Sequence, residues 1–227
     1  MEHEIKPSVT DREGERLLPV RVLYGTRNTA KLSEMRERLK SLPIVLTGLA
    51  DLKQDVPDIA ETGSTPLENA RQKAEFYYRT FHMPVFSCDS GLYFDRVPED
   101  IQPGVYVRRV HGKNLTDEEM IAYYSGLARK YGNLKARYKN AVCFVLDDTH
   151  RYEAMTPSME SREFLLTDRP HPVREQGFPL DSLSVDAASG LYFQDLGQDA
   201  WEKETDGMLE FFQEVFGKLA KVMNGTE

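Results

Sequence analysis

Residues 20–31, VRVLYGTRNTAK, pass from one kind of local structure to another within a few positions. Val20 to Tyr24 is a short β-prone run, and Gly25 ends it. After the glycine, apolar residues recur three or four positions apart, which is the period of an amphipathic helix: Leu32, Met35, Leu39 and Leu42. This stretch therefore predicts a strand, a loop and a helix in that order.

The rest of the chain alternates the same two periods, so we expect an α/β fold with a mixed central β-sheet flanked by helices. Further strands are expected at residues 44–47, 85–88, 141–146, 151–155 and 162–166, the later ones antiparallel. The strand that starts at Val85 is expected to end at Asp89-Ser90-Gly91. Helices are expected after Thr65 and Thr116, because each threonine precedes a glutamate by three residues and can form a capping box. A last helix is expected from about Asp206.

Three of these helices have a predicted buried face. For the helix after Thr65 it consists of Leu67, Ala70, Ala74, Tyr77 and Phe81. For the helix after Thr116 it consists of Met120, Tyr123, Leu127 and Tyr131. For the last helix it consists of Met208, Phe212, Val215, Leu219 and Val222.

Composition restricts the class of protein. The 227 residues are 40% apolar and 29% charged, as in ordinary globular proteins. A net charge of −8 argues against a surface that binds a nucleic acid polymer. The polar residues 1–19 have no apolar core of a signal peptide, and no apolar run is long enough for a membrane span. We expect a flexible tail over 1–19, a single domain over 20–227, a cytoplasmic location and no membrane association, with Cys88 and Cys143 as thiols inside strands.

The loop after the first strand has the features of an anion site. Asn28 or Thr29 can cap the following helix, and Lys31 lies in its first turn, where the helix dipole disfavours a cation. A phosphate would reverse that preference, because backbone N–H groups, the Thr26 hydroxyl and the Lys31 ammonium would face one anion. The alternative is that Lys31 extends into water.

Two more stretches carry charged groups suited to the same ligand. Glu61 precedes a Thr-Gly turn and is free to meet a hard cation, while Lys73 lies two turns inside a helix with its ammonium at the edge of the apolar stripe. Asp89 could hold Mg²⁺ and orient or deprotonate a water, and Ser90 could donate to a phosphate oxygen. The alternatives are solvated surface groups and a simple turn at the strand end.

Acyl transfer through Ser90 or Cys88 is the competing chemistry. It would need a histidine partner. The five histidines lie in the tail, beside turns or next to prolines, and form no pair or metal-binding spacing. Acyl transfer is therefore disfavoured.

Taken together, these stretches resemble the inosine triphosphate pyrophosphatase family, which hydrolyses non-standard purine nucleoside triphosphates. Its motif Thr-x-Asn-x-x-Lys is matched by Thr26, Asn28 and Lys31. Its motif Glu-Thr-Gly-x-Thr-x-x-Glu-Asn-Ala-x-x-Lys-Ala is matched from residue 61 to residue 74. Its motif Asp-Ser-Gly-Leu-x-Val-Asp is matched at residues 89–92 and 95, and a Pro-Gly-Val-Tyr follows at 103–106. The resemblance covers about residues 20–110.

The resemblance implies a metal-binding, catalytic or phosphate-binding role for each of these residues. Glu61 and Asp89 would bind Mg²⁺, and Asp89 would also be the catalytic base for water. The triphosphate would be held by Thr26, Asn28, Lys31, Lys73 and Ser90. Cleavage between the α and β phosphates would release a nucleoside monophosphate and pyrophosphate. Two lobes around a nucleotide cleft and a homodimer are also implied.

The second half of the chain departs from the family. The Phe-Gly-Tyr-Asp-Pro base motif stands here as residues 178–182, FPLDS, which keeps Phe178 for stacking and Asp181 for a hydrogen bond to the base. The Ser-His-Arg that reads a 6-oxo purine is missing near Thr205-Asp206-Gly207, and Cys88 replaces an acidic residue. Base specificity therefore stays open. A pyrophosphatase with altered base preference and a nucleotide-binding module with weak or lost catalysis are the alternatives.

Overall fold

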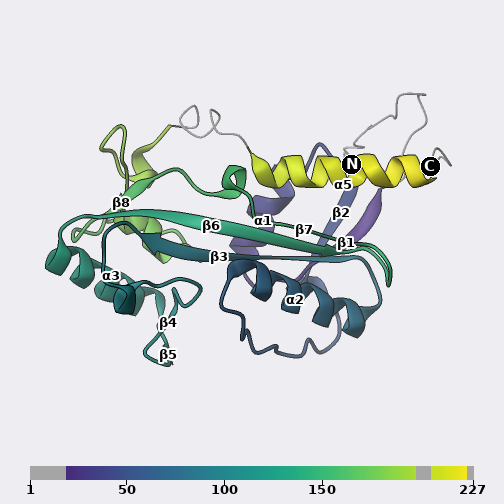
Figure 1. The fold of residues 1–227 in the computed structure, drawn as a ribbon, viewed down its shortest axis with the longest axis horizontal. Helices are drawn as coiled ribbons and strands as arrows, with labels where there is room; N and C mark the ends of the chain where they lie inside the picture. The colour runs from purple at the N-terminus through teal and green to yellow at the C-terminus, as the bar shows by residue number, and fades with distance from the viewer. Residues whose placement is uncertain (1–18, 198–205, 224–227) are drawn as a thin grey trace, which may run out of the picture.

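A computed structural model describes residues 19–197 and 206–223 of the chain, except for the side chains of 219–223. A seven-stranded sheet lies at the centre, in the order β2-β1-β3-β6-β8-β9, with β7 paired to β6 (Figure 1). Its strands are β1 (Val20–Tyr24), β2 (Ile44–Gly48), β3 (Val85–Phe94), β6 (Leu134–Val145), β7 (Arg151–Ala154), β8 (Phe164–Leu166) and β9 (Ser184–Asp186). β1 runs parallel to β2 and β3, and the remaining pairs are antiparallel. The predicted mixed sheet is confirmed.

Helices cover both faces of the sheet, and the longest strands, β3 and β6, run between them (Figure 1). The helices are α1 (Thr29–Arg38), α2 (Pro66–Phe81), α3 (Asp117–Tyr131) and α5 (Gly207–Met223). A small hairpin of β4 (Arg109–Val110) and β5 (Lys113–Asn114) precedes α3. None of the described helices combines the length and the apolar character that a membrane span requires.

Alternation along β3 and β6 assigns side chains to the two faces of the sheet. Phe86 and Phe144 pack with residues of α1 and α5 in one buried cluster. Ala141 and Cys143 pack against Ala70 and other residues of α2 in another. In the first half of β3, side chains at even positions therefore face α1 and α5, and those at odd positions face α2.

A third cluster lies at the other end of the β3–β6 pair. It joins Leu92 and Phe94 of β3 to α3, to β8 and to the short 3₁₀ helix Pro179–Leu183. The molecule thus has apolar cores at both ends of its longest strands. A division into two lobes around a nucleotide cleft stays a prediction, as do the domain bounds 20–227. The predicted tail falls largely on residues outside the described ranges.

The prediction that the Val85 strand ends at Asp89-Ser90-Gly91 is wrong. β3 continues to Phe94, and β6 pairs with it along its whole length, from Val85↔Val145 to Phe94↔Ala136. The polar and glycine residues looked like a strand end because nothing local reveals this long antiparallel partner. Asp89 and Ser90 therefore project from the middle of a strand, to opposite faces.

The predicted buried face of α3 is only partly right. Met120 is buried, but Tyr131 is 39% exposed, and Ile121, Tyr124 and Ala128 are buried instead. The helix is rotated because Tyr124 reaches into the molecule, where its hydroxyl donates to the Val107 carbonyl at 2.8 Å. Strand β9 was not predicted, since three residues show no readable period.

The other predicted helices and strands are confirmed, and several caps are formed as expected. In α5, Met208, Phe212 and Val215 are buried, whereas the side chains of Leu219 and Val222 lie outside the described residues. Cys88 and Cys143 lie inside strands as free thiols.

The α2 cap supports a first prediction. Thr65 Oγ1 accepts from the Glu68 N–H at 3.2 Å, and Glu68 Oε2 accepts from the Thr65 N–H at 3.3 Å. Replacing Thr65 with alanine is expected to lower the free energy of unfolding by about 1 kcal/mol. Thr80→Ala, which removes a hydroxyl from the last turn of the same helix, is the matched control in urea unfolding. Equal effects of the two variants would contradict the assigned cap.

Candidate active site

The predicted site residues gather where β1 stops and β3 continues. The last β1–β3 pair is Tyr24↔Phe86, and the Gly25 N–H donates to the Phe86 carbonyl at 2.8 Å. Beyond that point β3 has no strand partner on the β1 side, among the residues that the structure describes, until the bridge from Leu92 to Gly104. β2 and β3 lie on opposite sides of β1, so this is a topological switch point, where open α/β sheets bind ligands. Side chains from both faces of β3 flank this free edge.

On the α2 face, one ammonium joins two carboxylates. Lys73 Nζ lies 2.8 Å from Asp89 Oδ1 and 3.2 Å from Glu61 Oε1. Asn69 Nδ2 donates to the other Asp89 oxygen, Oδ2, at 3.1 Å. Burial alone would lower the pKa of Lys73, but the charges of Asp89 and Glu61 and their hydrogen bonds outweigh it and raise the pKa above its ordinary value. Lys73 is therefore a fixed positive charge between two acids.

The Glu61 loop is fastened to α2 through its backbone. The Gly63 N–H donates to Asn69 Oδ1 at 2.8 Å, so Asn69 connects the loop to Asp89. A Cβ on Gly63 would lie 2.6 Å from that amide oxygen, which is why a glycine is needed at this close approach. Arg109 Nη2 donates to the Glu61 carbonyl at 3.2 Å from the β4–β5 hairpin. Segments remote in sequence thus set the position of Glu61.

On the other face of β3, the β1–α1 loop contacts the segment Gly177–Asp181, which carries the predicted base-binding residues. Asn28 Oδ1 accepts from the N–H groups of Ala30 and Lys31, at 2.9 and 3.2 Å, and is the N-cap. Its Nδ2 donates to the Gly177 carbonyl at 3.4 Å. Gly177 has φ +87°, a left-handed conformation that suits glycine, and a Cβ there would lie within 3.0 Å of the Asn28 amide. Asn28 therefore joins the β1–α1 loop to this segment.

Thr26 and Lys31 keep groups available for a ligand. Thr26 Oγ1 accepts from the Asn28 N–H at 3.2 Å, which leaves the hydroxyl proton free to donate. Lys31 is half-buried and forms no ion pair with any residue that the structure describes. A hollow of about 510 Å³ adjoins this loop, between residues 27–30, Asp117 and residues 175–177. The loop can therefore offer a hydroxyl and a cation to an anion.

Ser90 does not join Asp89, because neighbouring residues of a strand face opposite ways. Its hydroxyl donates to Asn140 Oδ1 at 2.7 Å, and Asn140 Nδ2 donates to the Met159 carbonyl at 2.7 Å. Ser90 therefore lies on the α1 side of the sheet. Asn140 was not predicted, since only the register of β6 brings it opposite Ser90.

The residues predicted to contact the base lie at a 3₁₀ turn. Phe178 precedes the turn and Asp181 lies in its first part, half-buried, with no side-chain hydrogen bond to the described residues. Burial raises the pKa of Asp181 to about 7, and the negative charges of Glu175 and Glu34 add to the rise. Burial raises the pKa of Tyr138, and the negative charge of Asp181 raises it further. The stretch from Trp201 to Thr205 lies outside the described residues.

Cys88 faces the α1–α5 core. Burial raises the pKa of its thiol to about 12, although the Tyr24 hydrogen bond and the charges of Lys73 and Lys31 act in the opposite direction. A thiol with so high a pKa is not a nucleophile at neutral pH. This agrees with the expectation that acyl transfer is not the chemistry.

The donor set suits a hard divalent cation that is shared with a ligand. Magnesium is commonly held by one or two carboxylates together with substrate phosphates and waters. Glu61 and Asp89 supply two carboxylates within reach of one ammonium. Among the described residues there is no group of three or more His, Cys, Asp or Glu that would hold a metal on its own. The residues therefore fit a metal that arrives with a phosphate ligand.

Asp181 supports a prediction about pH. Because the native protein holds this proton more tightly than the unfolded chain, the native state binds more protons between about pH 4 and about pH 7. The contribution of Asp181 to stability is fully present below about pH 4 and is lost as the pH rises to about 7. Asp181→Asn should remove this loss, so the variant should gain stability relative to the wild type as the pH rises, in chemical unfolding.

Glu175→Gln provides a graded test, since it removes one repelling charge and should lower the midpoint of the same transition. Identical pH profiles for the wild type and Asp181→Asn would contradict the raised pKa.

Comparisons with known proteins agree with this geometry. Residues 22–167 match the model of the Ham1 family. A dITP/XTP pyrophosphatase of Thermus thermophilus is 32% identical over 180 residues, covering 78% of this chain and 82% of that protein. One of Oceanobacillus iheyensis is 38% identical over 101 residues, which are 44% of this chain and 50% of that protein. The chain thus spans about half the length of several curated relatives that it matches.

The structural comparison concerns the fold. The structure of a HAM1 protein from Coxiella burnetii superposes with a TM-score of 0.67 at 24% identity, covering 88% of this chain and 99% of that one. The resemblance predicted from the motifs is confirmed, since the family model spans those motifs and more than half of the residues. The chain belongs to the Ham1 family.

Proposed function

We propose that this protein is a nucleoside triphosphate pyrophosphatase, which hydrolyses substrates such as ITP, dITP and XTP to a nucleoside monophosphate and pyrophosphate. The observation that carries the proposal is the Glu61–Lys73–Asp89 arrangement at the free edge of β3. The names of the relatives, dITP/XTP pyrophosphatase, support the substrate class. Nucleotide hydrolysis needs a positioned water and compensation of phosphate charge, and this edge offers groups for both.

Asp89 is the proposed catalytic base. It accepts the proton of the attacking water while Asn69 and Lys73 hold its two oxygens in place. Mg²⁺, bound by Glu61 and Asp89 together with the phosphates, would supply positive charge to the reacting phosphate and acidify a bound water. Water attacks the α phosphorus, the bond to the bridging oxygen breaks, and pyrophosphate leaves with the bonding electrons. Lys73 offsets the repulsion between the two carboxylates and keeps them correctly oriented.

The triphosphate is proposed to meet Thr26, Asn28 and Lys31 on one side of β3 and Lys73 on the other. The Lys31 ammonium, which has no ion-pair partner in the described part of the chain, and the N-terminal end of α1 favour an anion at that loop. Ser90 is proposed to bind the triphosphate from the α1 side of the sheet. Its hydroxyl lies on that side, where it is hydrogen-bonded to Asn140.

The base is proposed to stack on Phe178 and to hydrogen-bond with Asp181. With a pKa of about 7, Asp181 has both a protonated form, which donates to a carbonyl, and an ionised form, which accepts from an N–H group. A 6-oxo purine presents both kinds of group on its edge. Asp181 can therefore supply part of what the missing His and Arg provide elsewhere in the family.

The deciding experiment is product analysis with a panel of ITP, dITP, XTP and the common nucleoside triphosphates, with and without Mg²⁺. Release of pyrophosphate and monophosphate from the non-standard purines, and its loss in EDTA, is the expected result. No pyrophosphate from any member of the panel would refute the proposal. Turnover of other bases would favour the pyrophosphatase of altered specificity, and nucleotide binding without turnover would favour a binding module.

A homodimer, which the family resemblance implies, and a cytoplasmic location, which the sequence composition indicates, remain predictions. Analytical ultracentrifugation of the full chain should give twice the mass of the 26.0 kDa protomer. A protomer mass at micromolar concentration would contradict the dimer.

A further inference from the structure

Two cations near Asp89 and Glu61 lack a carboxylate partner in the described part of the chain. They are Lys139 of β6 and Arg109 of the β4–β5 hairpin. Their neighbours are paired: Lys135 with Asp95 and Glu163, Arg137 with Glu160 and Glu163, and Arg108 with Asp117. The chain has 37 acidic and 29 basic residues, so carboxylates are in excess. That these two cations stay unpaired calls for an explanation.

Lys139 projects from the same face of the sheet as Asp89. It lies opposite Gly91 in the β3–β6 register, one pair along from Asp89↔Ala141 on that face. Residues in this diagonal relation lie within reach of long side chains. Lys139 can therefore reach a ligand held by Asp89.

A tyrosine ring supports the Lys139 ammonium. Lys139 Nζ lies 5.0 Å from the centre of the Tyr93 ring. Tyr93 folds back over Gly91, where a Cβ would come within 2.7 Å of the ring, so the glycine makes room for it. A cation on an aromatic face is held without losing its charge or its N–H donors. Lys139 is thus oriented and still free to bind an anion.

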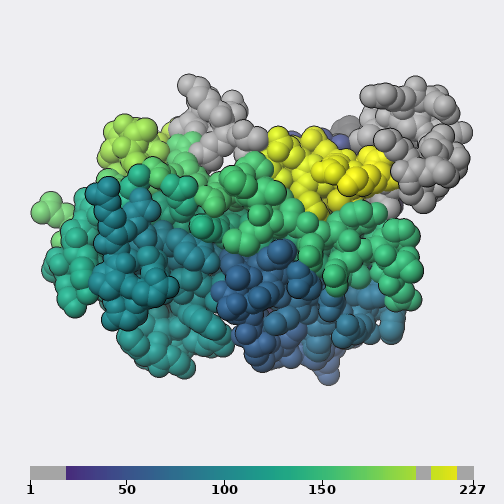
Figure 2. All heavy atoms as spheres, viewed as in Figure 1, coloured from purple at the N-terminus to yellow at the C-terminus, as the bar shows by residue number. Residues whose placement is uncertain are grey.

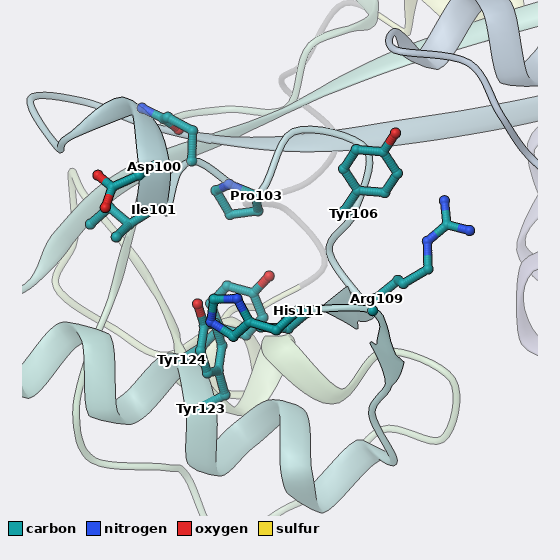
Figure 3. Close-up of a pocket in the computed structure, with 11 residues that line it drawn as sticks. Asp100, Ile101, Pro103, Tyr106, Arg109, His111, Tyr123 and Tyr124 are labelled. Atoms are coloured by element: carbon teal, nitrogen blue, oxygen red, sulfur yellow. The ribbon is translucent and has the colours of Figure 1, made fainter.

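Arg109 is held in the same way on the other side of Glu61. Its guanidinium lies 4.8 Å from the centre of the Tyr106 ring, and one N–H donates to the Glu61 carbonyl. Arg109 and Tyr106 also line the 340 Å³ pocket shown in Figure 3, together with His111, Tyr123 and Tyr124. The remaining guanidinium donors have no partner among the described residues. Figure 2 shows the dark-blue atoms of the α2 region beside the teal atoms of the residues that follow β3 in the chain.

The charges at the proposed reaction centre require further cations. Lys73 is already neutralised by Glu61 and Asp89, so it adds no net positive charge for a triphosphate. Lys31 lies on the opposite face of β3, beside the β1–α1 loop. A departing pyrophosphate gains negative charge as its bond to the α phosphorus breaks, and cations near it stabilise that change.

We propose that Lys139 and Arg109, each seated on a tyrosine ring, form a second phosphate-binding subsite that holds the β and γ phosphates of the substrate and then the pyrophosphate product. This inference rests on the proposed function and assigns the direction of the triphosphate across β3. The nucleoside end lies toward Phe178 and Asp181, and the pyrophosphate end lies toward the hairpin and β6.

Inorganic pyrophosphate is the probe that tests the subsite. Its dissociation constant in the presence of Mg²⁺ is measured by calorimetry for the wild type, Lys139→Met and Arg109→Met. Each variant should bind pyrophosphate about tenfold more weakly or worse, as expected for a lost hydrogen bond to a charged group. Inosine monophosphate should inhibit wild type and variants with the same inhibition constant, because it lacks the β and γ phosphates.

Matched controls separate charge at the subsite from charge in general. Lys135→Met removes an ammonium from the same face of β6, and Arg108→Met removes the guanidinium next to Arg109. Neither should change the affinity for pyrophosphate. Because Arg109 also holds the Glu61 loop, Lys139→Met is the variant that decides, and Arg109→Lys should restore part of the affinity.

The subsite is refuted if Lys139→Met binds pyrophosphate as tightly as Lys135→Met does. It is also refuted if Lys139→Met weakens the binding of inosine monophosphate as much as it weakens the binding of pyrophosphate. Its failure differs from a failure of the proposed function. A wild type that releases pyrophosphate from ITP, with pyrophosphate affinity independent of Lys139, would keep the function and refute the subsite. A wild type that turns over no nucleotide, but whose affinity for pyrophosphate depends on Lys139, would keep the subsite and refute the proposed function.

Discussion

Replacing Asp89 with asparagine is expected to reduce kcat for ITP by about a thousandfold or more, with the fold intact. The amide has nearly the same shape as the carboxylate, so Lys73 keeps its Glu61 partner and Asn69 keeps a hydrogen-bond partner at this position. It cannot accept a proton from water, and it removes one of the two anionic oxygen donors. The loss should therefore fall on kcat rather than on the ability to fold.

Asp95→Asn is the matched control for this variant. Asp95 follows β3 and is 47% exposed, paired to Lys135 at 3.6 Å, so its charge lies outside the proposed reaction centre. Steady-state kinetics with a pyrophosphate readout and thermal unfolding should be measured for both variants. Wild-type kcat in a folded Asp89→Asn protein would refute the role of Asp89 as base and metal ligand.

Local signals in the sequence predicted most of the helices. Thr65 and Thr116 each form the capping box that their spacing indicates, because such a cap is decided within one turn of helix. The strand at Val20 and the N-cap at Asn28 were predictable for the same reason. The grouping of Glu61, Lys73 and Asp89 came from the family motif, and their distances bear out the expectation that they lie together.

What the sequence could not predict depends on partners remote along the chain. Asp89 lies in the middle of a strand only because β6 pairs with ten consecutive residues of β3. The opposite faces of Asp89 and Ser90 follow from that pairing. Arg109 and Lys139 show no motif of their own, and only the hairpin and the β6 register bring them near Glu61 and Asp89.

The position of Asp89 also changes the argument for a ligand site. We expected a carboxylate beyond a strand end, where loops surround a ligand. The structure instead has a strand, β1, that ends beside a longer one, β3, so the ligand edge is lined by alternating residues of a continuous strand. One consequence is rigidity: the backbone of Asp89 is fixed by sheet hydrogen bonds, which suits a base that must be held in one place.

Lys73→Met is expected to have the second largest effect, on both turnover and stability. Methionine keeps the apolar stem of the side chain, but Glu61 and Asp89 then face each other without the ammonium. At neutral pH the metal-free variant should lose up to about 3 kcal/mol of stability, the lower end for breaking a buried ion pair, since Glu61 is 40% exposed and partly screened by water. Its kcat should fall about a hundredfold or more, because the Asp89 carboxylate loses the partner that orients it.

The dependence on Mg²⁺ distinguishes this role from simple packing. In the wild type the Lys73 ammonium already occupies oxygens of both carboxylates, so it competes with a free metal ion for them. Without nucleotide, Mg²⁺ should therefore raise the melting temperature of Lys73→Met more than that of the wild type. Arg71→Met, which removes a partly exposed cation of α2 paired to Glu153, is the control and should show the wild-type response. Equal responses to Mg²⁺ in all three proteins would mean that Lys73 does not hold the two carboxylates for a metal.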